Sequence, residues 1–263
     1  MFEKQIMHLH IPITPPLPYS AVHFLILIIG VCVTVISAVL AGKCSERTFR
    51  RLILIVGIAL TTSELIKQVY YTIIWDGGNY DLSLLPLQLC SMPLYLCFIY
   101  LAVKNTGIKN MIACFLSTFT LLGGLCALIV PTELFIPSLL LTVQALFWHF
   151  ALVFLGLAFA IRFSRNFSHR TFLLEAVFFL SLCLIAMLLN ALLDPLAISP
   201  MRLFFIGKNA PDIPILSQLY DRYGWFYSSA AMIFAELFGG YLLFLLEKGI
   251  QSRKHPEIRQ ISG

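Results

Sequence analysis

A thiol and an imidazole can act as a nucleophile and its general base, provided that the fold brings them together. Cys90 and His149 are the candidates here, because each lies in an apolar stretch long enough to cross a membrane as a helix. From the helical rise, Cys90 is expected roughly 6 to 10 Å and His149 roughly 16 Å below the same end of the bundle. Neither residue is conclusive alone: buried cysteine often acts as a small apolar residue, and a lone histidine can simply bond to a neighbouring helix.

Polar side chains accompany the candidate nucleophile. Gln88 and Ser91 lie close to Cys90 in the sequence and add polar groups beside its thiol. Pro86 is typical of a first helical turn, so the helix that carries Cys90 is expected to begin there. A reactive thiolate also needs a neighbouring imidazole or ammonium group, which would be His149 or Lys67.

Ionisable side chains inside a bilayer are costly unless they face a cavity or a partner, so they indicate candidate functional sites. Glu64 and Lys67 are three residues apart, and they could either neutralise each other or line a cavity. Glu236 either lines the same cavity or pairs with Lys67. Asn190 lies near the outer end of its predicted helix, where a cap, a loop anchor and a substrate contact are all compatible with its position.

The elements that must position these residues are membrane helices. Hydrophobic residues make up 59% of the 263-residue chain and charged residues only 12%, which excludes a soluble domain. The sequence predicts an all-α bundle of about seven transmembrane helices, with the candidate site between the second, third and fifth helices and with the seventh as a further contributor. The predicted spans are residues 20–42, 51–75, 86–104, 110–130, 138–162, 170–193 and 223–247.

Loop charges predict the orientation of this bundle. Lysine and arginine follow the first, third, fifth and seventh spans, whereas the loops after the second and fourth spans carry only Asp76, Asp81 and Glu133. Positive charge favours the cytoplasmic side, so the N-terminus is expected outside and the C-terminus in the cytoplasm. The expected division is an extracytoplasmic segment 1–19, a transmembrane domain 20–247 and a basic cytoplasmic tail 248–263. The net charge of +5 then indicates contact with anionic lipid, and no nucleic-acid partner is expected.

Other chemistries have little support in the sequence. It contains no phosphate-binding glycine loop, nucleophile-elbow serine motif or zinc signature, so no cofactor is expected. His8 and His10 lack further ligands nearby, and no metal site is expected. The cysteines number seven, and all but Cys44 lie in predicted spans, so no disulfide framework is expected.

Three segments carry a resemblance to a known family. The run Leu85-Pro86-Leu87-Gln88-Leu89-Cys90-Ser91, the run from Gly123-Gly124 to Pro131-Thr132, and then His149 resemble the YwaF-like integral membrane family, which includes the animal transmembrane protein 164. That resemblance implies a lysophospholipid acyltransferase, with the nucleophile at Cys90 and the histidine at His149. Gln88 stands where histidine is frequent in bacterial members. Asn190 and the stretch Trp225-Phe226-Tyr227 are further similar positions.

The functional hypothesis is a lipid transacylase that uses a Cys90–His149 pair and an acyl-thioester intermediate, with membrane phospholipid or lysophospholipid as its substrate. With water as the acceptor, the same site would be a lipase. The alternative is a transporter or ligand-binding membrane protein in which Glu64, Lys67, His149 and Glu236 line a polar pocket. A structural membrane protein without catalysis is the third possibility. The sequence does not indicate the oligomeric state.

Overall fold

The computed structural model describes residues 11–131 and 134–254, with side chains described as far as residue 250. His8, His10, Thr132, Glu133 and Arg259 lie outside these residues. The α-helices are α2 (Ala21–Lys43), α3 (Glu46–Tyr70), α4 (Met92–Ala102), α5 (Thr106–Ser117), α6 (Phe119–Ile129), α7 (Leu139–Phe163), α8 (His169–Leu193), α9 (Pro214–Tyr223) and α10 (Trp225–Lys254). Short helical turns are η1 (Tyr71–Trp75), η2 (Leu82–Leu84), η3 (Leu89–Ser91), η4 (Ser164–Asn166), η5 (Asp194–Leu196) and η6 (Leu203–Phe205).

Polar caps determine where several helices begin. A cap side chain that accepts a hydrogen bond from the first turn satisfies a backbone N–H group that has no partner within the helix. Ser20, Ser45 and Asn105 do this for α2, α3 and α5. Ser168 and Thr171 form a reciprocal capping box at the start of α8.

The prediction of an all-α membrane protein is confirmed for the described part of the chain. Six helices there are long and apolar enough to cross a membrane, namely Ala21–Lys43, Glu46–Trp75, Thr106–Ile129, Leu139–Asn166, His169–Leu196 and Trp225–Ile250. Large apolar side chains on these helices are exposed, among them Ile28 of α2, Leu184 of α8 and Phe234 of α10. Such a surface suits lipid rather than water. The chain is a multi-pass integral membrane protein.

The third predicted span differs most from the structure. A single helix over 86–104 was expected, but only the shorter apolar stretch Leu89–Ala102 is helical, and its α-helix starts at Met92. Pro86 lies in an irregular segment, and Pro93 is the proline of the first turn. Leu85 is extended, as expected for the residue before a proline. The prediction that Pro86 starts the helix was therefore wrong.

The long helix over Thr106–Ile129 bends in its middle, which separates α5 from α6. Thr118 at the bend has a φ of −105° and a ψ of −79°, away from ideal helical values. Its hydroxyl donates to the carbonyl of Cys114, and it also bonds to the carboxylate of Glu175 on α8. A threonine that bonds back to the preceding turn commonly bends a helix.

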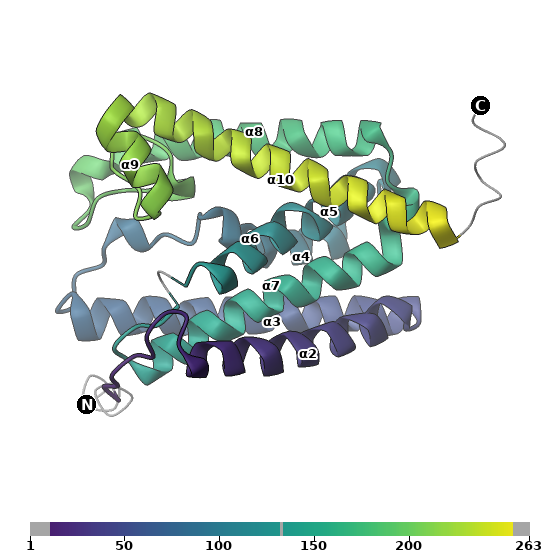
Figure 1. Cartoon of the computed structure of the whole chain (residues 1–263), viewed down its shortest axis with the longest axis horizontal. Helices are drawn as coiled ribbons and strands as arrows, with labels where there is room; N and C mark the ends of the chain where they lie inside the picture. The colour runs from purple at the N-terminus through teal and green to yellow at the C-terminus, as the bar shows by residue number, and fades with distance from the viewer. Residues whose placement is uncertain (1–10, 132–133, 255–263) are drawn as a thin grey trace.

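Helix α7 lies in the middle of the bundle, with α2 and α3 on one side and α5 and α6 on the other (Figure 1). It packs mainly against α2, α6 and α5. Its inner face contributes to an aromatic core, where Phe159 contacts Phe49 and Tyr100 edge to face at ring-centroid distances of 5.2 and 5.0 Å. This packing gives α7 a fixed place from which its side chains can reach several neighbours.

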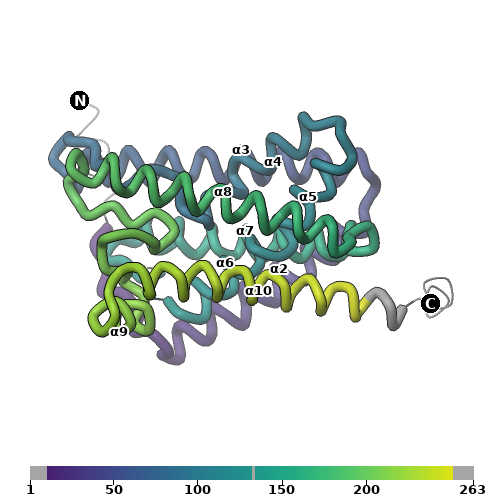
Figure 2. The backbone as a smooth tube through the Cα atoms, turned by 90° about the horizontal axis from the view of Figure 1, so that it is seen from above, coloured from purple at the N-terminus to yellow at the C-terminus, as the bar shows by residue number. Residues whose placement is uncertain are grey.

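The irregular segments between α3 and α4 and between α8 and α10 lie at the same end of the bundle in both views (Figure 2). Helix α2 begins at this end, whereas α10 ends at the opposite one (Figure 1). Non-helical backbone at membrane depth is tolerated only where it is buried in protein or lines a cavity. This end of the bundle is therefore where a site is expected.

Candidate active site

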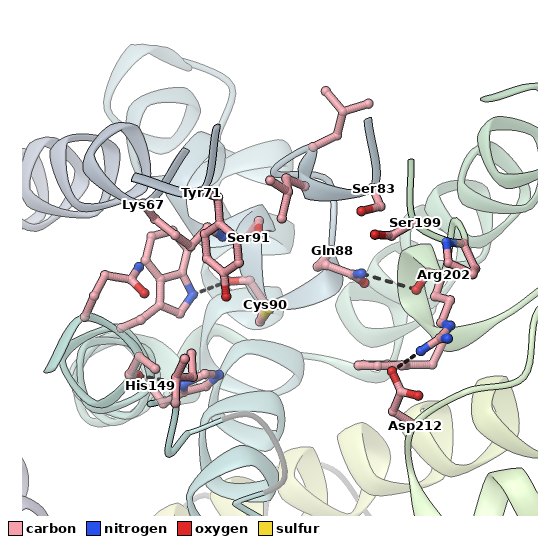
Figure 3. Close-up of a pocket in the computed structure, with 18 residues that line it drawn as sticks. Lys67, Tyr71, Ser83, Gln88, Cys90, Ser91, His149, Ser199, Arg202 and Asp212 are labelled. Atoms are coloured by element: carbon pink, nitrogen blue, oxygen red, sulfur yellow. Dashed lines mark hydrogen bonds and ion pairs between the residues drawn. The ribbon is translucent and has the colours of Figure 1, made fainter. Parts of the chain in front are cut away.

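A cavity of about 550 Å³ lies at this end of the bundle. Its wall is formed by the end of α3, the irregular segment 83–91, the first turns of α7 and the loop 199–212 (Figure 3). Cys90 and His149 both line it. The structure thus brings the two residues singled out by their chemistry to one cavity.

Cys90 lies in the short turn η3, just before the N-terminus of α4. The thiol-bearing residue is half-buried, and its backbone carbonyl accepts a hydrogen bond from Nε1 of Trp148 at 3.1 Å. Trp148 is itself buried and also lines the cavity. The nearby helix N-terminus favours negative charge, which a thiolate would carry.

His149 extends from α7 one residue after Trp148. Its Nδ1 lies 2.8 Å from the carbonyl oxygen of Ala145. Because a carbonyl only accepts, Nδ1 carries the hydrogen of this bond, and in the neutral ring Nε2 is then the proton acceptor. This tautomer is the one that suits a general base whose Nε2 faces a nucleophile.

The two polar residues that flank Cys90 in the sequence have different surroundings. Gln88 lines the cavity, but its amide also bonds to the loop opposite: Nε2 donates to the carbonyl of Arg202 at 3.2 Å, and Oε1 accepts from the backbone N–H of Phe204 at 2.7 Å. Ser91 is buried and also lines the cavity. Gln88 therefore connects the turn that carries Cys90 to the loop, whereas Ser91 lies in the cavity wall.

Glu64 and Lys67 form an ion pair within α3, with 2.9 Å between Oε1 and Nζ. The same Glu64 oxygen accepts from Nε2 of Gln68 at 2.6 Å, and Gln68 also donates to the carbonyl of Leu84. Lys67 lines the cavity and Glu64 lies behind it. Two alternatives were predicted, a mutual ion pair and a place in a cavity wall. Glu64 shows only the ion pair, whereas Lys67 both pairs with Glu64 and lines the cavity.

Asn190 holds a loop and is not part of the cavity wall. Its Nδ2 donates to the carbonyls of Leu203 at 3.0 Å and Ile206 at 2.6 Å, and its Oδ1 accepts from the N–H of Leu203 at 2.9 Å. Among the three predicted roles for Asn190, the geometry is that of a loop anchor.

Glu236 is half-buried on α10 and does not line this cavity. It makes no ion pair within the described part of the chain, and Lys67 pairs with Glu64 instead. One of its carboxylate oxygens is buried without a hydrogen-bond partner there. The structure does not bring Glu236 together with the other candidates.

Sequence reasoning missed the charged side of the cavity. Arg202 and Asp212 both line it and form an ion pair, and Gln144 on α7 is also part of the wall. Arg202 and Asp212 lie in the loop between the sixth and seventh predicted spans, and nothing in their spacing indicated that they line one cavity with Cys90. Only the path of the loop brings them there.

Asp81 joins the two irregular segments that form the cavity rim. Its carboxylate accepts from the N–H and hydroxyl of Ser83 at 3.0 and 2.7 Å, and from the N–H groups of Ile198 and Ser199 at 3.0 Å each. Burial opposes ionisation, but the hydrogen bonds from Ser83 and Ser199 outweigh it and lower the pKa of Asp81 to about 2. Asp81 therefore remains a carboxylate, and Ser83 and Ser199 are held in the wall.

One comparison with known proteins gave a match. Residues 18–242 match the family model described as the TMEM164 family, which covers most of the chain and all the residues of the cavity. No curated protein and no solved structure matched.

Proposed function

The chain belongs to the TMEM164 family, and from this membership and the cavity geometry we propose that it is a lipid acyltransferase. In this proposal it moves an acyl chain from a membrane phospholipid to a lysophospholipid through a thioester on Cys90. The observation that carries the proposal is that Cys90 and His149 line one cavity, with the ring of His149 in the tautomer that leaves Nε2 as the proton acceptor.

The first half-reaction forms the acyl-enzyme. Nε2 of His149 takes the proton of the Cys90 thiol, and the thiolate attacks the carbonyl carbon of a phospholipid ester. The tetrahedral intermediate collapses with cleavage of the ester C–O bond, and His149 returns the proton to the departing oxygen of the lysolipid. Ser91 and the second N–H of Gln88 are the side chains nearest in sequence that could donate to the oxyanion.

The second half-reaction reverses these steps with a different acceptor. His149 takes a proton from the free hydroxyl of a lysophospholipid, and that oxygen attacks the thioester carbonyl. The C–S bond then breaks, and the Cys90 thiolate regains its proton from His149. Water in the place of the lysolipid would give hydrolysis by the same route.

The position of the cavity supports a lipid as the substrate. It lies at one end of a bundle of membrane helices, next to irregular backbone that needs protein or water around it. Lipid esters lie near the ends of such helices, and their acyl chains could enter sideways from the bilayer. The loop charges predict that this end is extracytoplasmic, where cytoplasmic acyl-CoA would have no access, so transfer between lipids is the simpler scheme.

The test is intact-protein mass spectrometry of the purified protein after incubation with phospholipid. We expect an added fatty-acyl mass in the native protein that is absent in Cys90→Ala and forms at least about 100-fold more slowly in His149→Gln, as for loss of a general base. Cys126→Ala is the matched control, since Cys126 lies outside the cavity wall and should acylate normally.

Two results would contradict the proposal. One is an acyl adduct that persists in Cys90→Ala, and the other is lipid turnover that Cys90→Ala does not affect. If no adduct and no turnover occur with several lipid classes, a ligand-binding or transport role becomes the function to test, and Lys67→Gln is then the first variant.

A further inference from the structure

The cavity has two chemically different sides. In the close-up, His149 and Arg202 lie on opposite sides of Cys90, with Gln88 between Cys90 and Arg202 (Figure 3). Tyr71, Trp148 and His149 make the first side largely aromatic, with Lys67 as its cation, whereas Ser83, Ser199, Arg202 and Asp212 line the other side. An ester that reacts at Cys90 would therefore have a polar subsite next to it.

Arg202 is the cation of this polar side. One nitrogen of its guanidinium, Nη1, pairs with Asp212, while Nε is buried without a hydrogen-bond partner in the part of the chain that the structure describes. The Asp212 side chain is 56% exposed, so water screens the pair and little holds the guanidinium to that carboxylate. The Arg202 guanidinium thus has N–H donors that could bind an anion other than Asp212.

The backbone of Arg202 is held in place relative to Cys90. Gln88 directly precedes the turn that carries Cys90, and its side chain binds the carbonyl of Arg202 and the N–H of Phe204. Asn190 holds the next residues of the loop. Phe204 and Phe205 have φ values of 58° and 54°, which such residues rarely adopt, so these bonds maintain a conformation that the loop would not choose alone.

We propose that Arg202 binds the phosphate of the lipid headgroup and so positions the ester of a glycerophospholipid at Cys90. The planar guanidinium can donate two parallel hydrogen bonds to phosphate oxygens, which a lysine cannot do. Lys67, the other cation of the wall, is already paired with the buried Glu64. Arg202 also lies in a loop outside the six long apolar helices, whereas Cys90 lies near the start of the shorter apolar stretch Leu89–Ala102. This inference rests on the proposed function and names the part of the substrate that the site recognises.

The test compares two acyl donors that differ only in the phosphate-containing headgroup, a phospholipid and the diacylglycerol with the same chains. We expect Arg202→Gln to raise KM for the phospholipid roughly tenfold or more, as for loss of hydrogen bonds to a charged group. The rate of Cys90 acylation by diacylglycerol should be unchanged, so the preference for phospholipid is lost. Arg202→Lys should restore part of it. Arg222→Gln, on α9 and outside the cavity wall, is the matched control and should retain the native preference.

An unchanged preference in Arg202→Gln would overturn the inference while leaving the thioester chemistry intact. If the native protein forms no thioester, native mass spectrometry of bound phospholipid decides instead, with Cys90→Ala compared to Cys90→Ala/Arg202→Gln. Loss of bound lipid on removal of the guanidinium supports the phosphate site even then, and equal retention overturns it. If inorganic phosphate alone displaces the bound lipid, whichever lipid is used, the site binds free anions. That result would also overturn the inference.

Discussion

At the scale of single residues, α7 supplies both the candidate base and a hydrogen bond to the residue that carries the candidate nucleophile. His149 faces the cavity, and the preceding Trp148 donates from Nε1 to the carbonyl of Cys90. The two side chains are consecutive in the sequence, yet Trp148 bonds to the turn that carries Cys90, whereas His149 is the proposed acceptor of the thiol proton. The relative position of thiol and imidazole therefore depends on the Trp148 hydrogen bond.

Trp148→Phe should test this dependence. Phenylalanine keeps most of the ring contacts but removes the N–H donor, so the carbonyl of Cys90 loses its partner at a cost of roughly 1 kcal/mol. We expect acyl-adduct formation to be several-fold slower and the melting temperature to fall slightly. Trp225→Phe, at the exposed start of α10, should change neither. A native rate in Trp148→Phe would show that the hydrogen bond does not position the thiol.

Asp81 provides a pH-dependent contribution at the same scale. The pKa of its carboxyl falls from an ordinary 3.8 to about 2, because hydrogen bonds to the ionised form outweigh burial. The ionised form therefore stabilises the fold, by about 2 kcal/mol at neutral pH for a shift of this size. That contribution is complete above pH 3.8 and disappears as the pH falls through about 2.

Unfolding measured against pH should show this contribution. We expect Asp81→Asn to lower the free energy of unfolding by about 2 kcal/mol at pH 7, and the difference from the native protein to vanish near pH 2. The exposed Asp221→Asn serves as control and should follow the native curve. Equal stabilities of Asp81→Asn and the native protein at pH 7 would contradict the assigned role.

At the scale of the elements, two adjacent glycines of α6 face different surroundings. Gly124 is the one at which α6 approaches α7 closely. A Cβ atom there would lie 3.0 Å from Cβ of Leu152 and 3.1 Å from the carbonyl oxygen of His149, both on α7. A Cβ atom on Gly123 would meet nothing within 4 Å. Gly124 therefore lets α6 pack against the backbone of the residue that carries the imidazole.

The neighbouring glycines offer a matched pair of variants. Gly124→Ala should overpack the contact, destabilise the protein by about 1–3 kcal/mol and slow acylation, because α7 must shift at His149. Gly123→Ala should be neutral or slightly stabilising, since alanine is the better helix former by about 1 kcal/mol. Melting temperature and acylation rate measure both effects. Similar behaviour of the two variants would contradict the assigned packing.

The third predicted span shows where sequence reasoning stops at this scale. Six long helices were predictable because an apolar stretch of about 20 residues must satisfy its backbone internally. Pro86 and Pro93 both suit a helix start, and their local sequence does not separate them. Contacts from elsewhere do so: the carbonyl of Leu84 accepts from Gln68 and that of Pro86 from the Tyr95 hydroxyl, so these groups need no helical partner.

At the scale of the whole molecule, the candidate pair was predictable and the charged subsite was not. A thiol and an imidazole within apolar helices are unusual enough to be noticed, and shared depth suggested that they meet. Arg202 and Asp212 are ordinary residues for a loop, and their place in the wall depends on tertiary contacts made by Gln88 and Asn190. Gln88 and Asn190 were candidate site residues in the sequence, but their hydrogen-bond partners are backbone groups, which a pattern of side chains does not reveal.

The central position of α7 has a mechanical consequence for the proposed acyl transfer. Membrane helices tilt to match the thickness of the surrounding bilayer. Helix α7 carries both His149 and the Trp148 side chain that donates to the carbonyl of Cys90. A tilt of α7 would therefore move the imidazole and this hydrogen-bond donor together. The reacting atoms would then keep their register in thin and thick membranes alike, while the outer helices absorb the mismatch.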